Sequence, residues 1–148
     1  YNPEMILAGR RLNDNMGSYI AAAVIKKMMQ KKINTAAAKV LVLGLTFKEN
    51  CPDLRNTRII DIITEFKEYG LEVDVYDPWA DSAEAQQEYG ISLLPELATA
   101  SYDAAVIAVS HQQFTKYSID DIRKLCKTPA VIYDVKGIFA HHDVDGSL

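Results

Sequence analysis

Four short apolar runs alternate with helical segments along most of this chain, and this alternation limits the folds available to it. Strands are predicted at 39–45, 71–76, 104–109 and 130–135, and helices at 56–69, 82–89 and 119–126. A short extended piece is expected near 91–94, and the weakly patterned end, 140–148, is expected to be frayed or truncated. Strands that alternate with helices form right-handed crossovers and a parallel sheet covered on both faces. The sequence therefore predicts a three-layer α/β/α, Rossmann-like domain with a mainly parallel sheet.

A long amphipathic helix is expected before the first strand, from Asn13 to about Lys32. Its apolar side chains recur every four positions: Met16, Ile20, Val24 and Met28. Asn13 or Asp14 is expected to cap its start. At about 1.5 Å per residue such a helix is long for a small domain, so we predict that the stripe packs against a partner, either a missing domain or a second subunit. We expect a division of the chain near residue 35, between residues 1–35, which contain this helix, and residues 36–148, which contain the alternating strands and helices.

The composition excludes several classes of protein. Among 148 residues, 16 Lys and Arg stand against 20 Asp and Glu, with no basic block that would suit nucleic acid. No apolar run approaches the roughly 18 residues that span a bilayer. Cys51 and Cys126 form no C-x-x-C motif, and the three histidines lack zinc-finger spacing, so we expect a cytoplasmic protein without a structural metal. Because the chain begins without Met, we expect a piece of a longer protein.

The connection after the first strand is the strongest candidate for a functional site. Residues 46–55 form a loop of about ten residues, whereas such loops usually have two to six. Ligands of open parallel sheets bind beyond the carboxyl ends of the strands. Lys48, Arg55 and Arg58 bring cationic side chains to the start of the next helix, which offers N–H groups to an anion. A phosphate or pyrophosphate is the expected ligand.

An alternative interpretation of the loop stays open. Arg55 could pair with Asp53 or Glu49, and Lys48 could simply be solvated. Gly44 is followed by Leu-Thr-Phe, so the G-x-G-x-x-G fingerprint of a dinucleotide-binding fold is absent. We therefore do not expect a complete NAD domain.

The loop also resembles a known family. Residues 44–57, GLTFKENCPDLRNT, match the G-x-x-F-K-x-x-x-x-D-x-R-x-S/T pattern of the UDP-glucose/GDP-mannose dehydrogenase family, in its C-terminal UDP-binding domain. Other segments resemble the same family in the expected order: 3–14, 76–78, 110–114 and 133–137. The segments AGRR at 8–11 and DVKG at 134–137 are most similar to the UDP-N-acetylhexosamine 6-dehydrogenase branch.

The resemblance implies a function and a set of contacts. It implies NAD-dependent oxidation of a UDP-sugar to its uronic acid for surface polysaccharide synthesis, with NAD bound mainly by a missing N-terminal domain. Phe47, Lys48 and Lys136 would meet the nucleotide-sugar, and Arg55 would reach the NAD pyrophosphate. Arg10 could approach the substrate from a neighbouring subunit, although surface charge at a helix start is an equally good interpretation. The resemblance also implies a homodimer or higher homo-oligomer through the first helix. It further implies that residues 1–35 end a central helical or dimerisation region and that residues 36–148 form the C-terminal nucleotide-sugar-binding domain.

Neither cysteine is expected to be catalytic. In the family that this chain resembles, the cysteine nucleophile lies in an upstream segment, before the central helix. Cys51 has no adjacent histidine to activate it, and Cys126 ends an apolar helical stretch typical of the core. We therefore expect no catalytic residue in this chain, which alone would be inactive.

The remaining polar residues have competing interpretations. His111 follows a strand and either faces the cleft or makes a local hydrogen bond in its loop. Asp77 either binds a ribose or forms a turn, and the proline after it favours the turn. Trp79 is a cleft wall or a packing residue. His141 and His142 are not expected to be ligands.

A function of another class also stays open. The chain could be a free-standing α/β regulatory or interaction module whose first helix mediates assembly and whose loop carries structural ion pairs. Receiver-type signalling is disfavoured because the first strand ends in Gly44-Leu45-Thr46, without an acidic phosphoacceptor.

Overall fold

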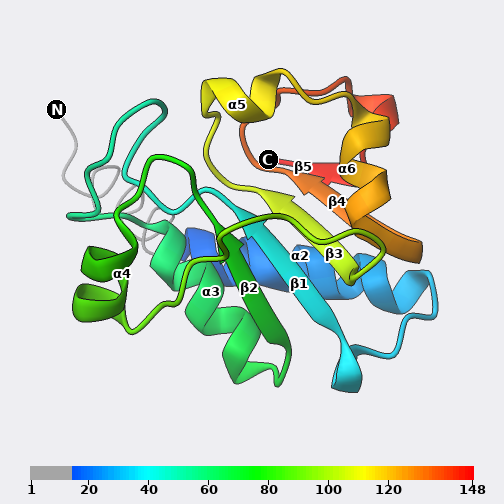
Figure 1. Cartoon of the computed structure of the whole chain (residues 1–148). Helices are drawn as coiled ribbons and strands as arrows, with labels where there is room; N and C mark the ends of the chain where they lie inside the picture. The colour runs from blue at the N-terminus through cyan, green and yellow to red at the C-terminus, as the bar shows by residue number, and fades with distance from the viewer. Residues whose placement is uncertain (1–14) are drawn as a thin grey trace, which may run out of the picture.

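A five-stranded parallel sheet forms the centre of the molecule, as a computed structural model of residues 15–148 shows (Figure 1). The strand order is β2-β1-β3-β4-β5, and every neighbouring pair is parallel. The strands are β1 (Lys39–Leu43), β2 (Glu72–Tyr76), β3 (Tyr102–Ile107), β4 (Cys126–Asp134) and β5 (Gly146–Ser147). The predicted α/β fold with a parallel sheet is confirmed.

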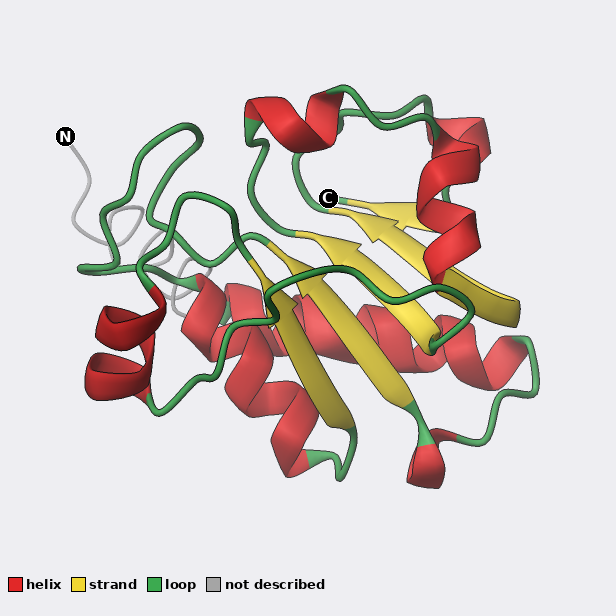
Figure 2. Cartoon of the chain, in the orientation of Figure 1, coloured by secondary structure: helices red, strands yellow, loops and turns green. Residues whose placement is uncertain are grey.

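Helices cover both faces of this sheet (Figure 2). The α-helices are α2 (Met16–Gln30), α3 (Ile59–Glu68), α4 (Ser82–Tyr89), α5 (Gln112–Thr115) and α6 (Ile119–Leu125), and Thr35–Ala37 and His141–Asp143 are short 3-10 helices. α2 and α3 pack on one face, and α5 and α6 pack on the other. Among the described residues, no helix has the length and apolar character needed to cross a membrane.

The interior strand β1 is apolar at every position after Lys39, and its packing shows why. Val40 and Val42 belong to the core under α2 and α3, whereas Leu41 and Leu43 belong to the core under α5 and α6. All four side chains are fully buried. Alternate residues of a strand point to opposite faces, so a strand covered on both sides needs apolar residues throughout.

The long predicted helix, α2, packs into the core on one face of the sheet. Ile20, Val24 and Met28 are fully buried, and α2 contacts α3, β3 and β4. A Cβ at Gly17 would lie 2.7 Å from Cβ of Asp61 on α3, so the glycine permits the close approach of the two helices. The prediction that the stripe packs against a partner is therefore wrong for these residues, because it closes one face of the chain's own sheet.

The observed bounds of α2 and the residue before it can be compared with the predicted ones. The helix runs from Met16 to Gln30, inside the predicted range, and Asn15 stands before it without a side-chain capping bond. The expected caps, Asn13 and Asp14, lie outside the described residues. The predicted domain boundary at residue 35 stays a prediction.

Three further details differ from the sequence predictions. α3 begins at Ile59 rather than at 56, because Asn56 adopts a left-handed conformation with φ 60°. The four-residue helix α5 was not predicted. The end of the chain is paired rather than frayed: β5 joins the sheet beside β4, and a carboxylate oxygen of Asp145 accepts the backbone N–H of Ile132 at 2.7 Å.

Candidate functional site

The strand order places a candidate site where β1 and β3 end. The chain passes from β1 to β2 on one side and later returns to β3 on the other, so β1 and β3 are neighbours whose following helices, α3 and α5, lie on opposite faces. Such a reversal is where open α/β sheets hold ligands. The long loop 44–58 leaves the sheet at this point.

Directly after β1, the space beside the backbone is filled by another residue of the chain. Gly44 has φ 102°, and a Cβ there would lie only 2.5 Å from Cβ of Val109. In nucleotide folds the glycines of this turn allow a pyrophosphate to approach the backbone; here the space beside Gly44 holds Val109 instead. Gly44 thus allows the end of β1 to pack closely against Val109.

The carboxylate of Asp77, directly after β2, anchors the start of the loop. Its Oδ2 accepts the backbone N–H groups of Leu45 at 2.6 Å and Thr46 at 3.0 Å. Its Oδ1 accepts those of Trp79 at 2.7 Å and Ala80 at 3.1 Å. Burial alone would raise the pKa of Asp77, but these bonds and one from His111 outweigh it and lower the pKa. The predicted turn-forming role is confirmed, and the same carboxylate also binds the neighbouring loop.

A buried histidine joins the loops after β1, β2 and β3. The imidazole of His111 is fully buried, and its Nε2 lies 3.0 Å from Asp77 Oδ2 and 3.1 Å from Thr46 Oγ1. Its Nδ1 accepts the backbone N–H of Asn50 at 3.0 Å, while Asn50 Oδ1 accepts the N–H of Gln112 at 2.8 Å. His111 therefore does not face a cleft but makes hydrogen bonds between loops.

Trp79 has a packing role in the same assembly. Its ring stacks against His111 with centroids 6.1 Å apart, and its indole N–H donates to Gln113 Oε1 at 2.8 Å. Since Gln113 belongs to α5, the loop after β2 is also tied to that helix.

The tip of the loop presents two of the three predicted nucleotide-sugar residues, Phe47 and Lys48, to solvent. Phe47 is 54% exposed although its backbone N–H donates to Asp53 O at 2.8 Å, and Lys48 is exposed beside it. Phe47 lines a hollow of about 430 Å³ together with Asn56, Thr57, Arg58 and Asp61. Hydrogen bonds thus hold the backbone of the loop, while the side chains of Phe47 and Lys48 are exposed to solvent.

The structure shows the alternative that was left open for Arg55, an ion pair with Asp53. Its Nε lies 3.1 Å from Asp53 Oδ1, yet its side chain is 84% exposed. The helix start that was expected to bind an anion lies farther along, after Arg58, which is 3.8 Å from Asp61.

Lys136 lies at the same edge of the sheet, after β4, and is exposed. The turn that carries it is built by Asp134, whose fully buried carboxylate accepts the N–H groups of Gly137 at 2.9 Å and Phe139 at 2.8 Å. One strand, β3, separates this turn from β1 and its loop. Arg10 lies outside the described residues.

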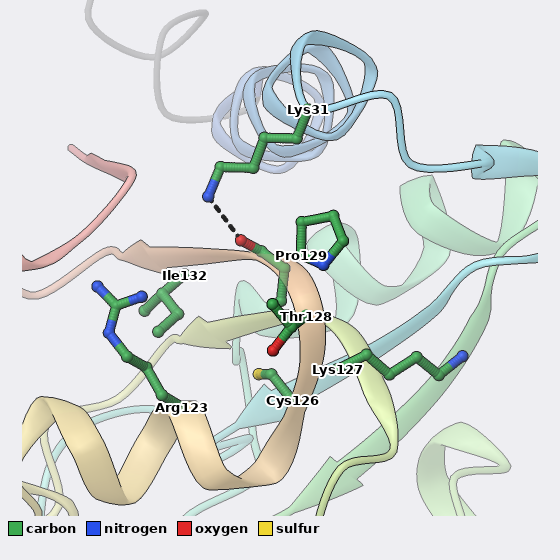
Figure 3. Close-up of a pocket in the computed structure, with 8 residues that line it drawn as sticks. Lys31, Arg123, Cys126, Lys127, Thr128, Pro129 and Ile132 are labelled. Atoms are coloured by element: carbon green, nitrogen blue, oxygen red, sulfur yellow. Dashed lines mark hydrogen bonds between the residues drawn. The ribbon is translucent and has the colours of Figure 1, made fainter.

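Another hollow, lined in part by basic residues, lies at the opposite ends of the strands, where β4 begins (Figure 3). Lys31 pairs there with Asp145 at 2.6 Å and donates to the carbonyl of Ala130 at 2.7 Å. Lys127 pairs with an aspartate of β3 at 3.5 Å, and in Figure 3 it points away from Arg123. These cations already have protein partners and do not converge, so this hollow is not the candidate site.

Cys126 lies in the core, as predicted. Cys51 is half-buried in the loop and Cys126 is buried, and both are free thiols. Burial raises the pKa of the Cys126 thiol to about 11, which suits a core residue rather than a nucleophile.

Comparisons with known proteins identify the family of this chain. The sequence model of the UDP-glucose/GDP-mannose dehydrogenase family, UDP binding domain, matches residues 41–141. The chain is 50% identical, over its whole length, to a UDP-N-acetyl-D-glucosamine 6-dehydrogenase of Salmonella typhi and 48% identical, over 92% of its length, to one of Pseudomonas aeruginosa. It covers 35% and 32% of those two proteins, so it spans about a third of the curated relatives that it matches.

Solved structures show the same fold. An NDP-N-acetyl-D-galactosaminuronic acid dehydrogenase of Methanosarcina mazei superposes with a TM-score of 0.83 at 22% identity, over 97% of this chain and 30% of that one. A UDP-D-ManNAc dehydrogenase of Pyrococcus horikoshii gives 0.78 at 24% identity, over 95% of this chain and 32% of that one. The resemblance carried by residues 44–57 is thus confirmed. This chain belongs to the UDP-glucose/GDP-mannose dehydrogenase family and contains its UDP binding domain.

Proposed function

We propose that this chain is the UDP-sugar-binding part of an NAD-dependent nucleotide-sugar 6-dehydrogenase that oxidises a UDP-N-acetylhexosamine to its uronic acid. The observation that carries the proposal is the loop after β1, which is anchored by buried hydrogen bonds and leaves Phe47 and Lys48 exposed beyond the strand ends. The names of the two bacterial relatives at about 50% identity support the hexosamine as substrate.

The chemistry of the exposed side chains suits such a ligand. A UDP-sugar carries a diphosphate, which the Lys48 ammonium can neutralise, with Lys136 as a second cation at the same edge of the sheet. The exposed ring of Phe47 offers an apolar surface to a base or a sugar. Oxidation requires groups outside this chain: NAD would accept the hydride, held mainly by an N-terminal domain, and Arg55 would contribute a contact to its pyrophosphate.

Assembly, location and biological role are parts of the same proposal. A homodimer or higher oligomer would use the outer face of α2, where Tyr19 is 62% and Met29 is 64% exposed, and could bring Arg10 of a neighbour to the substrate. The free thiols of Cys51 and Cys126 suit the reducing cytoplasm. Surface polysaccharide synthesis would consume the uronic acid product.

Titration calorimetry of the chain with UDP-N-acetylglucosamine tests the proposal. We expect binding that Lys48→Ala weakens by about tenfold, because a charge-assisted bond to the diphosphate is lost. Lys67→Ala is the matched control, since Lys67 is an exposed lysine in the last turn of α3. Absence of binding by the folded chain would favour the alternative, a free-standing α/β regulatory or interaction module.

A further inference from the structure

His111 lies where it can control the shape of the loop without touching a ligand. It is fully buried, and its two ring nitrogens contact residues at both ends of the segment 46–50: Nε2 lies 3.1 Å from Thr46 Oγ1, and Nδ1 lies 3.0 Å from the backbone N of Asn50. Phe47 and Lys48 lie between these two contacts. A single side chain from another loop therefore holds both ends of this segment in place.

The hydrogen bonds assign a single neutral form to this imidazole. Nδ1 accepts from the backbone N–H of Asn50, so it carries no proton. Thr46 Oγ1 donates its one proton to the carbonyl of Lys48 at 3.0 Å and can only accept from the ring. The remaining proton is therefore on Nε2, where it points at both Thr46 Oγ1 and the carboxylate of Asp77, 3.0 Å away.

We propose that His111 is a positioning residue for nucleotide-sugar binding: as the neutral Nε2–H form, it holds the segment 46–50 in the conformation that presents Phe47 and Lys48. This inference rests on the proposed function. The decisive contact is the Nδ1 bond to Asn50, because Thr46 is also held by its own N–H bond to Asp77 at 3.0 Å, whereas Asn50 is the far end of the segment. The side chain of Asn50 extends the restraint to the first residue of α5 through its bond to Gln112.

Two substitutions separate the two nitrogens. In His111→Asn the side-chain oxygen takes the place of Nδ1 and still accepts from Asn50, but the donor to Asp77 is lost. In His111→Gln the amide nitrogen takes the place of Nε2 and still donates to Asp77, but the acceptor for Asn50 is lost. His142→Gln makes the same chemical change at a histidine whose side chain is 84% exposed and serves as the control.

The affinity for UDP-N-acetylglucosamine, the thermal midpoint and the amide exchange of residues 46–50 are measured for each variant. We expect His111→Asn to bind within about twofold of the wild type, and His111→Gln to bind roughly three- to tenfold more weakly with faster exchange at Asn50. A merely structural role predicts the opposite order, because the smaller Asn leaves a larger cavity against Trp79 and Phe114 and loses the bond to Asp77. That order, or equal affinities, would overturn the proposal.

A measurement on the unaltered chain keeps the test independent of folding in the variants. The nitrogen chemical shifts of the His111 ring distinguish a protonated from an unprotonated Nδ1. We expect an unprotonated Nδ1 and a protonated Nε2; the reverse form could not accept from Asn50 and would refute the assignment. If the wild type does not bind UDP-N-acetylglucosamine, the proposed function fails; if it binds and His111→Gln binds equally well, only the positioning role fails.

Discussion

The guanidinium of Arg55 is paired with Asp53 inside its own loop. Asp53 Oδ1 lies 3.1 Å from Arg55 Nε and also accepts the backbone N–H of Arg55 at 2.8 Å, so the two residues form a compact turn. The side-chain bond from Arg55 is the main reason that the pKa of Asp53 is lowered, and the same bond raises the pKa of Arg55. An anionic ligand that reaches Arg55 must therefore share it with this carboxylate.

This pairing can be measured directly. We expect Arg55→Ala to raise the pKa of Asp53 back toward its ordinary value of 3.8, because the bond that favours the ionised carboxylate is removed. An NMR titration of the side-chain carboxyl carbon reports the change. Arg58→Ala, three residues farther along, should leave the Asp53 titration where it is. An unchanged titration in Arg55→Ala would show that the pair does not form in solution.

Asp77 should make the stability of the fold depend on acid. Its pKa is lowered in the folded protein, so its contribution is complete above the unfolded value of about 4 and is lost as the pH falls through the lower folded value. We expect Asp77→Asn to reduce the free energy of unfolding by roughly 2–4 kcal/mol at pH 7, since an amide nitrogen would face N–H donors.

Urea unfolding at pH 7 and at pH 3 tests this expectation. The difference between the wild type and Asp77→Asn should shrink at the lower pH. Asp120→Asn, at an exposed position of α6, is the control and should change little at either pH. A difference that stays constant with pH would mean that the Asp77 carboxylate is not the stabilising form.

Gly44 should tolerate no side chain. Its φ of 102° is unfavourable for any L-residue, and an added Cβ would lie 2.5 Å from Cβ of Val109. Gly90 also has a positive φ, 66°, but a Cβ there has open space around it. We therefore expect Gly90→Ala to cost about 1 kcal/mol of stability and Gly44→Ala about 2–5 kcal/mol, from strain and overpacking together. Equal losses in urea unfolding would mean that Val109 moves aside easily.

The two thiols should differ in reactivity. Burial raises the pKa of Cys126 to about 11, about two units above the ordinary 9.0, which lowers its thiolate fraction about a hundredfold at neutral pH. Cys51 is half-buried in the loop. We expect iodoacetamide to label Cys51 well before Cys126 in the native chain, and both at similar rates in urea. Peptide mass spectrometry follows the labelling, and rapid native labelling of Cys126 would contradict its burial.

The sheet could be predicted because burial leaves a local trace in the sequence. β1 and β3 are covered on both faces and are therefore apolar at nearly every position, which is visible without any knowledge of their neighbours. β5 and α5 could not be predicted in the same way. Each has four residues or fewer and depends on tertiary contacts, such as the hydrogen bond from the backbone N–H of Ile132 to the carboxylate of Asp145.

The loop of the candidate site could be predicted from the sequence, whereas the hydrogen bonds that hold the loop in place could not. The length of the loop and the cations in it, Lys48 among them, are local features of the sequence, whereas Phe47 was chosen through the resemblance to the family. The bond between His111 and Asn50 joins residues 61 positions apart, so it depends on the strand order. One signal was present: Asp77 and His111 each follow a strand closely, and the carboxyl ends of parallel strands meet at one edge of the sheet.

The position of α2 has a practical consequence for anyone who wishes to express this domain alone. The stretch that the family model recognises begins at residue 41, after the helix has ended. A recombinant protein trimmed to that start would lose Ile20, Val24 and Met28, and the apolar face of β3 and β4 that α2 contacts would face water. A soluble product should therefore retain the whole helix, and primers placed at the start of the recognised stretch are expected to yield aggregates.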